Sequence, residues 1–174
     1  MQEIETERLT VRPIAESDWE AIREIWLDFK QSPYVYYDTD KNTEPDDVKK
    51  RIARWAEATR SGKAHVFFVS CLKGSVIGFF SLNQSGQGYE IGYGFRESFQ
   101  GKGYARESLA AILAYAKTLG AGKIYAGTAL KNLPSVHLLE SVGFQMVSRE
   151  YLSFFQDENG KDIIFEGGNF VLEL

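Results

Sequence analysis

The segment from residue 88 to residue 130 constrains the fold of this chain more than any other part of its sequence. Residues 88–95, "GYEIGYGF", alternate in character after a glycine-bearing loop, which predicts a strand. Residues 104–120, "YARESLAAILAYAKTLG", repeat apolar positions at helical spacing, and residues 123–130, "KIYAGTAL", predict a further strand. A strand, a helix and a strand in this order form a right-handed crossover between parallel strands. The sheet therefore contains at least one parallel pair.

The rest of the chain predicts antiparallel strands and three more helices. Ser17 followed by Glu20 is a capping-box pattern that predicts the start of the first helix. The turn "KGS" joins two apolar strands, and "DENGK" joins two long C-terminal strands. The order β-α-α-β-β-β-α-β-α-β-β predicts an α+β fold, with a mixed, mostly antiparallel sheet flanked by helices, in one domain spanning residues 1–174. The other predicted elements are strands at 8–14, 64–72 and 75–82 and helices at 17–30, 43–62 and 132–144.

Composition and charge argue against several classes of protein. Of the 174 residues, 44% are hydrophobic and 25% are charged, as in ordinary globular domains. A net charge of −4, with scattered lysines and arginines, argues against a nucleic-acid partner. No apolar run is long enough for a membrane span and "MQEIETERLTVRP" does not resemble an export signal, so we expect no membrane partner and a cytoplasmic location. Cys71 is the single cysteine, and no cysteine/histidine cluster predicts a metal site.

The segment "QGKGYA", residues 100–105, has two interpretations. It is either a simple glycine turn into a helix or a cradle in which backbone N–H groups at a helix start bind phosphate. Lys102 and Arg106 add positive charge beside it. The segment is not a P-loop, because Gly103 stands where that motif needs serine or threonine. It is not a dinucleotide fingerprint either, because Arg106 stands where the third glycine is needed.

Q-x-x-G-x-A between a strand and a long helix resembles the acyl-CoA-binding motif [QR]-x-x-G-x-[GA] of the GNAT superfamily of N-acetyltransferases. "IETERLTVRPIAESDWEAI", "YEIGYGFRESFQGKGYARESL" and "NLPSVHLLESVGF" are similar to corresponding parts of the branch related to ribosomal-protein alanine and serine N-acetyltransferases. The similarity covers about residues 4–152. It implies a GNAT-like fold and acetyl-CoA as the co-substrate, without a metal.

The resemblance also implies which residues bind acetyl-CoA. The end of the strand at 88–95 is expected to splay from its neighbour, so that its backbone pairs with the pantetheine arm. The glycine loop is expected to hold the pyrophosphate, and Asn132 to contact the arm while it also caps its helix. The implied cofactor-binding residues are Tyr93, Gly94, Phe95, Gln100, Gly101, Lys102, Gly103, Tyr104, Ala105, Arg106 and Asn132.

Two residues are candidates for proton transfer. Ser135 stands three residues after Asn132, where the related branch has a serine near the thioester sulfur, so it is the candidate general acid. Many other family members instead carry a tyrosine at the position of Leu139. Glu90, a carboxylate in an otherwise apolar strand, is the candidate general base acting through water. The alternatives are a plain helix position for Ser135 and a solvent-facing or ion-paired position for Glu90.

Other reactive side chains are expected to be structural. The resemblance implies direct attack by the amine without an acyl-enzyme, which fits Cys71 as a small core residue inside a strand. His65 opens a strand, and His137 occupies a variable helix position, so we expect structural roles for both.

The acceptor side of the site is the least constrained by sequence. Tyr34, Tyr36 and Tyr37 lie in a loop that is expected to form the acceptor wall, followed by Asp38 and Asp40, which would attract an amine cation. These tyrosines alternatively roof the core. The expected acceptor is a primary amine, either a protein N-terminus or a small molecule. A non-catalytic acyl-CoA sensor or assembly domain is the alternative function, and the C-terminal hairpin is suited to homodimer formation.

Overall fold

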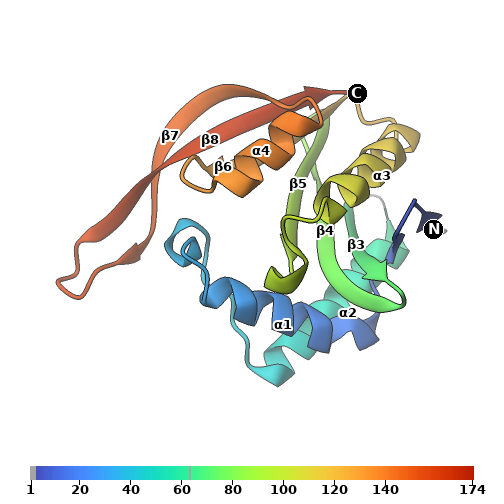
Figure 1. Ribbon diagram of the computed structural model, residues 1–174, viewed down its shortest axis with the longest axis horizontal. Helices are drawn as coiled ribbons and strands as arrows, with labels where there is room; N and C mark the ends of the chain where they lie inside the picture. The colour runs from blue at the N-terminus through green and yellow to red at the C-terminus, as the bar shows by residue number, and fades with distance from the viewer. Residues whose placement is uncertain (1–2, 63) are drawn as a thin grey trace.

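A single sheet runs through the molecule, and its strands follow the predicted order. The computed structural model describes residues 3–62 and 64–174. The strands are β1 (Ile4–Glu5), β2 (Thr10–Pro13), β3 (His65–Leu72), β4 (Ser75–Ser85), β5 (Gly88–Phe95), β6 (Lys123–Ala129), β7 (Gln145–Gln156) and β8 (Asp162–Glu173). In the described residues they form an eight-stranded sheet in the order β1-β2-β3-β4-β5-β6-β8-β7 (Figure 1).

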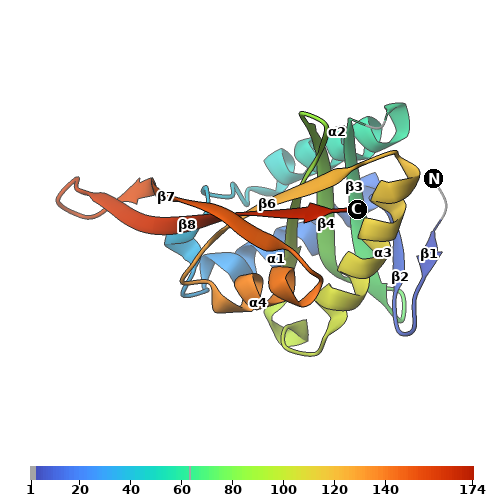
Figure 2. The same cartoon turned by 90° about the horizontal axis from the view of Figure 1, so that it is seen from above.

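Helices cover both faces of this sheet. They are α1 (Trp19–Lys30), α2 (Pro45–Ser61), α3 (Tyr104–Thr118) and α4 (Leu133–Ser141), with short 3-10 helices η1 (Glu16–Asp18), η2 (Val35–Tyr37) and η3 (Glu97–Phe99). One core cluster joins α3 and α4 to the sheet through residues such as Leu109 and Leu139, and a second joins α1 and α2 through residues such as Ile25 and Ile52. Figure 2 shows α2 and α3 on opposite sides of the sheet. The predicted α+β class is confirmed.

Most predicted elements are present with small differences at their ends. The turn "KGS" joins β3 to β4 as predicted, with Lys73 and Gly74 both at positive φ. α3 ends in a left-handed glycine as its sequence indicates: Gly120 has φ +80° and its N–H donates to the carbonyl of Lys117. The sequence did not predict β1, a two-residue strand that pairs with β2.

The predicted capping box at Ser17 and Glu20 is wrong. The first α-helix begins at Trp19, after the 3-10 turn η1, and its first turn has no side-chain cap. The side chain of Asp18 instead accepts hydrogen bonds from the backbone N–H of Ala15 (2.7 Å) and from both Nη atoms of Arg12 (2.8 Å each). A buried carboxylate held by a bidentate arginine makes a stronger anchor for the turn than a serine hydroxyl.

The sheet is held together at its centre by very little pairing. β5 and β6 are parallel, as predicted, and pair at only two positions, Tyr89 with Ile124 and Glu90 with Tyr125. Gly88 makes this contact possible, because a Cβ there would lie 2.1 Å from the carbonyl oxygen of Lys123. On their outer sides, β5 continues to pair with β4 as far as Phe95, and β6 pairs with β8 along its whole length. The sheet therefore divides into two leaves that diverge beyond Glu90.

The C-terminal strands β7 and β8 form a long hairpin that extends beyond the rest of the molecule (Figure 1). Its tip is the predicted "DENGK" turn, in which Asp157 accepts hydrogen bonds from the backbone N–H groups of Asn159 and Lys161. The hairpin packs against η2, since Tyr36 meets Phe155 edge-on and Tyr37 lies 5.3 Å from Phe165 between ring centroids. These contacts place the tyrosine loop directly against the C-terminal hairpin.

Candidate active site

The divergence of β5 from β6 opens a wedge in the sheet. The backbone of Tyr93, Gly94 and Phe95 lies past the last pair shared with β6, while its other edge stays bonded to β4. Backbone N–H and C=O groups on the inner edge of β5 therefore have no partner strand among the described residues. Backbone polar groups need hydrogen-bond partners, so this edge suits an extended ligand that carries amide groups. The geometry expected for this strand end is present.

The glycine loop at the end of β5 leads directly into the N-terminus of α3. Gly101 and Gly103 both take the left-handed conformation, with φ +72° and +81°. Gly103 is the N-cap residue, and no side chain in the described residues caps the helix. The first N–H groups of α3 are consequently open to an anion, and the helix dipole adds partial positive charge there. The Nε2 of Gln100 donates to the carbonyl of Phe95 (3.0 Å), which fixes the loop to the strand.

Lys102, Tyr104, Ala105 and Arg106 complete the predicted loop. Lys102 and Arg106 are exposed, and the Nζ of Lys102 donates to the carbonyl of Ser98 at 2.8 Å. Tyr104 and Ala105 are half-buried and pack against the core as the first residues of α3. The loop thus presents cationic side chains outward and its apolar residues inward.

Arg8 supports this loop and was not predicted as a site residue. Its Nε donates to the carboxylate of Glu107 at 2.7 Å, its Nη1 donates to the carbonyl of Lys102 at 3.0 Å, and its guanidinium lies over the ring of Tyr104. Burial disfavours ionisation of Glu107, but hydrogen bonds from Thr6 and Arg8 outweigh it and lower its pKa. The contact joins residues almost a hundred positions apart, so no local pattern could predict it.

Asn132 is the N-cap of α4, as expected. Its Oδ1 accepts a hydrogen bond from the backbone N–H of Ser135 at 3.4 Å. Leu139, one turn further along α4, is fully buried in the core. The position at which other family members have a tyrosine is therefore occupied here by a packing residue.

Ser135 and Tyr93 are linked across the wedge. The hydroxyl of Ser135, in the first turn of α4, lies 2.7 Å from the phenolic oxygen of Tyr93 on β5. Burial raises the pKa of Tyr93 to about 12, and the hydrogen bond with Ser135 lowers it only in part. The phenol therefore stays protonated near neutral pH and can donate to Ser135 Oγ, leaving the hydrogen of Ser135 free for another acceptor. The sequence indicated Ser135 but gave no sign of its partner.

Glu90 lies on the opposite face of the sheet from this pair. It is the last residue of β5 paired with β6, and its side chain is exposed. Cross-strand neighbours share a face, so Glu90, Asn83 on β4 and His65 on β3 form a polar row on the face covered by α1 and α2. The Nδ1 of His65 lies 3.0 Å from the Oδ1 of Asn83. Glu90 is therefore a carboxylate accessible to water at the point where β5 and β6 diverge.

The tyrosine loop has a different environment from the one its sequence suggested. Tyr34 is half-buried, and Tyr36 and Tyr37 contact the C-terminal hairpin as described above. Asp38 forms an ion pair with Lys41 (3.0 Å) and Asp40 with Lys30 (3.3 Å), so both carboxylates already have cationic partners. The loop and the hairpin are therefore joined through these aromatic contacts.

Comparisons with known proteins agree with this geometry. A family model described as "Acetyltransferase (GNAT) domain" matches residues 8–145. The chain belongs to the GNAT acetyltransferase family. This GNAT domain is 27% identical to the uncharacterized N-acetyltransferase p20 of Bacillus licheniformis over 150 residues, which is 83% of either chain.

Solved structures share the same fold as this GNAT domain. The ribosomal-protein-S5-alanine acetyltransferase from Vibrio fischeri is similar with a TM-score of 0.82 and 17% identity, covering 99% of this chain and 97% of that one. RimL, a ribosomal L7/L12 α-N-protein acetyltransferase in complex with coenzyme A, is similar with a TM-score of 0.82 and 18% identity, covering 99% and 98%. The protein is thus an acetyl-CoA-dependent N-acetyltransferase, and the wedge and glycine loop are suited to its co-substrate.

The remaining reactive side chains of the GNAT domain lie apart from the wedge or are buried. Cys71 is buried in the core, and burial raises the pKa of its thiol. His137 is exposed on α4. Among residues 3–62 and 64–174, no group of three or more His, Cys, Asp or Glu side chains is arranged to hold a metal ion. No helix in the same residues is long and apolar enough to span a bilayer.

Proposed function

We propose that this GNAT domain transfers the acetyl group of acetyl-CoA to a primary amine by direct attack. The observation that carries the proposal is the wedge between β5 and β6, with a hydroxyl pair on one face and a carboxylate on the other. A donor held on the α3 face and an acceptor on the Glu90 face would meet between the two strands. Aligning two reactants in this way supplies much of the rate enhancement of a group transfer.

Acetyl-CoA is proposed to bind along the inner edge of β5 and the start of α3. Its amide-containing arm would hydrogen-bond the backbone of Tyr93, Gly94 and Phe95, and Asn132 would contact the same arm. Its pyrophosphate would lie on the N–H groups of the loop from Gln100 to Arg106. The open space at Gly101, where an added Cβ would meet no atom within 4 Å, agrees with this placement.

The proposed reaction balances without an acyl-enzyme. The amine nitrogen bonds to the thioester carbonyl carbon, the C–S bond breaks, and coenzyme A leaves as a thiolate. The attacking amine is neutral. Glu90 would accept, through water, the proton that its nitrogen loses as the C–N bond forms, and Ser135 would donate a hydrogen bond to the developing thiolate. Tyr93, whose hydroxyl lies 2.7 Å from that of Ser135, would donate to Ser135 in turn and so fix the direction of the serine hydrogen.

The proposed acceptor is a primary amine on either a protein N-terminus or a small molecule. RimL and the Vibrio fischeri enzyme are named for acetylating ribosomal proteins, so a protein N-terminus is one candidate acceptor. A small amine is the other, because one fold serves many acceptors. The tyrosine loop, with Tyr34, Tyr36 and Tyr37, would border the acceptor in either case.

Two measurements test the proposal. Saturating acetyl-CoA should raise Tm by several degrees, because a ligand that binds only the folded state stabilises it. Thiol release across a panel of amines should then show turnover. Tight cofactor binding without thiol release from any amine would favour the alternative, a non-catalytic acyl-CoA sensor, and absence of any thermal shift would remove the proposed donor site.

We also propose an oligomeric state and a cellular location for this protein. The first is a homodimer formed through the C-terminal hairpin, since β7 is an edge strand with exposed apolar side chains such as Val147 and Tyr151. Sedimentation of the wild type would reveal it. The second is a cytoplasmic location, with which the reduced, buried thiol of Cys71 is compatible.

A further inference from the structure

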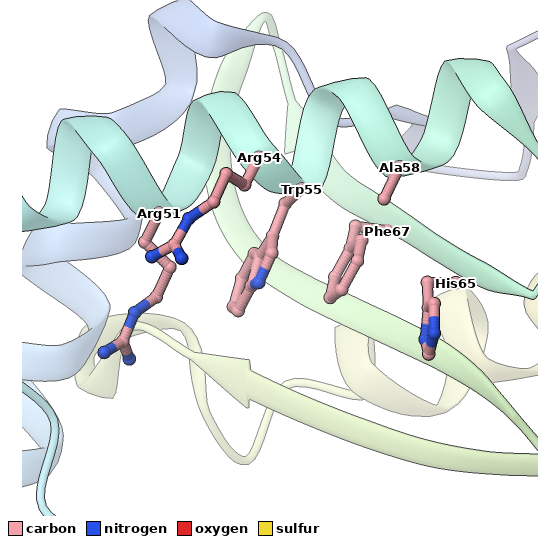
Figure 3. A pocket seen from close by; sticks show the side chains of 6 residues that line it. All are labelled: Arg51, Arg54, Trp55, Ala58, His65 and Phe67. Atoms are coloured by element: carbon pink, nitrogen blue, oxygen red, sulfur yellow. The ribbon is translucent and has the colours of Figure 1, made fainter.

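A pocket of about 440 Å³ opens between α2 and the sheet (Figure 3). One side is a stripe on α2, and the floor comes from β3. The ring of Trp55 stacks on that of Phe67 with a centroid distance of 4.4 Å and an interplanar angle of 6°. The residues that line the pocket are Arg51, Arg54, Trp55, Ala58, His65 and Phe67.

The pocket is cationic in an acidic protein. The chain has a net charge of −4, yet neither Arg51 nor Arg54 forms an ion pair within the part of the chain that the structure describes. Arg51 lies over the ring of Trp26 at 5.3 Å, and Arg54 is exposed. In Figure 3 both guanidinium groups lie at one end of the stacked rings and His65 at the other. Two guanidinium groups beside an aromatic floor are suited to a carboxylate on an extended ligand.

Sheet register places this pocket on the acceptor side of the wedge. His65 is opposite Asn83, and Asn83 is opposite Glu90, the candidate base. One row further along, Phe67 is opposite Ser81, and Ser81 is opposite Gly92 on β5. The pocket floor, Glu90 and the open part of β5 therefore share one face of the sheet.

The same strand register gives the distance between the pocket floor and the wedge. Adjacent strands lie about 4.8 Å apart, so two strand intervals separate His65 from Glu90, or Phe67 from Gly92, by about 10 Å. A ligand that reaches from the pocket floor to the wedge must span at least roughly 10 Å. In a single α-amino acid the carboxylate lies too close to the amine nitrogen to span this distance. An extended chain of about three residues is long enough to do so.

Building on the proposed function, we propose that the pocket of Arg51, Arg54, Trp55 and Phe67 binds a carboxylate of the acceptor, at least about 10 Å from the amine that is acetylated. The acceptor class is thus a primary amine joined through an extended spacer to an anionic group. A short acidic peptide and an ω-amino acid share this chemistry.

The test compares acceptors that differ only in the distal charge. Initial rates of thiol release are measured with triglycine against triglycinamide, and with ω-aminooctanoate against ω-aminooctanamide. The first pair represents a peptide and the second a non-peptide source of the same charge. Glycine against glycinamide controls for a carboxylate placed too close to the amine. Wild type should prefer each long carboxylate by about tenfold or more in kcat/KM, as expected for a charge-assisted pair, and should not prefer glycine.

Variants identify the pocket as the cause. Arg51→Gln combined with Arg54→Gln should abolish the preference for triglycine and leave the rate with triglycinamide within about twofold. Lys50→Gln removes one charge from the same helix outside the pocket and should preserve the preference. Equal use of charged and neutral acceptors by wild type, or equal losses for both in the arginine variant, would overturn the proposal.

A binding measurement separates this inference from the proposed function. Calorimetric titration of N-acetyltriglycine and its amide into the protein reports on the pocket without turnover. Carboxylate-dependent binding that the arginine variant loses, in a protein that releases no thiol with any amine, would support the pocket and contradict the acetyl transfer. Turnover without carboxylate-dependent binding would overturn the pocket alone.

Discussion

Replacing Tyr93 by phenylalanine removes one oxygen atom from the active-site wedge and should slow acetyl transfer only through Ser135. The two hydroxyls lie 2.7 Å apart, and Tyr93 reaches Ser135 from the neighbouring leaf of the sheet. A neutral hydrogen bond of this kind contributes about 1 kcal/mol, so Tyr93→Phe should lower kcat about fivefold. Ser135→Ala would remove the proposed hydrogen bond to the departing thiolate and should lower kcat about tenfold, near the low end for a bond to a charged group.

The double variant is the informative measurement. If Tyr93 acts by orienting Ser135, its hydroxyl has no further effect once the serine is gone, and the double variant should be about tenfold slower than wild type. Independent effects would multiply to about fiftyfold. Stopped-assay rates at saturating acetyl-CoA and acceptor, together with KM for acetyl-CoA, provide the comparison. A fiftyfold loss would refute the proposed coupling.

Two controls test whether the losses in the Tyr93 and Ser135 variants are specific to the paired hydroxyls. Ser141→Ala removes a hydroxyl from the same helix whose hydrogen bond goes to the backbone carbonyl of Leu138, and its rate should match wild type. The pH dependence gives a second check. Because the pKa of Tyr93 is raised to about 12, the phenol does not ionise in the assay range, and Tyr93→Phe should lower the rate without changing the shape of the profile up to about pH 10. A lost ionisation in the variant would mean that Tyr93 itself transfers the proton.

Three other perturbations test the site. Glu90→Gln should lower kcat and flatten its pH dependence if Glu90 is the base, and an unchanged profile would remove that role. Glu107→Gln should lower Tm at neutral pH: the folded pKa of Glu107 is lowered, so its stabilisation is present above the unfolded pKa of about 4.3 and is lost as the pH falls through the folded value. The Tm difference from wild type should therefore close in acid, and a constant difference would exclude the ionised Glu107 as its cause. Gly103→Ala should cost about 1 kcal/mol of stability, because φ is +81° and the new Cβ would lie 3.3 Å from Nη2 of Arg8. It should also raise the Kd for acetyl-CoA, measured by calorimetry, and an unchanged Kd would argue against the loop as the pyrophosphate site.

The sequence was sufficient for features that depend on neighbouring residues. Alternating strands, the helical spacing of α3 and the glycine turn that precedes it are all encoded within a few positions of one another. Asn132 as an N-cap followed from the same local chemistry. The capping box at Ser17 failed because a competing interaction, the pairing of Asp18 with Arg12, re-formed the turn one residue later.

Features made by distant parts of the chain could not be predicted in this way. Arg8 supports a loop more than ninety residues away, and Tyr93 meets Ser135 only because α4 follows a strand that diverges from β5. The pocket of Arg51 and Arg54 depends on how α2 lies on β3. Each of these contacts depends on how elements that are distant in sequence pack together, which no local motif specifies.

The two-pair junction between β5 and β6 also has a mechanical consequence. The leaf formed by β6, β8 and β7 is attached to the other leaf beside Val171, which is opposite Tyr125, and extends about ten residues from there to the hairpin tip. At about 3.3 Å per residue this is a lever of roughly 33 Å. A rotation on the order of 10° at the junction would move the tip by roughly 6 Å. The contacts of Tyr36 and Tyr37 with the hairpin lie on the outer part of that lever, so a small twist of the sheet is amplified where the acceptor would enter.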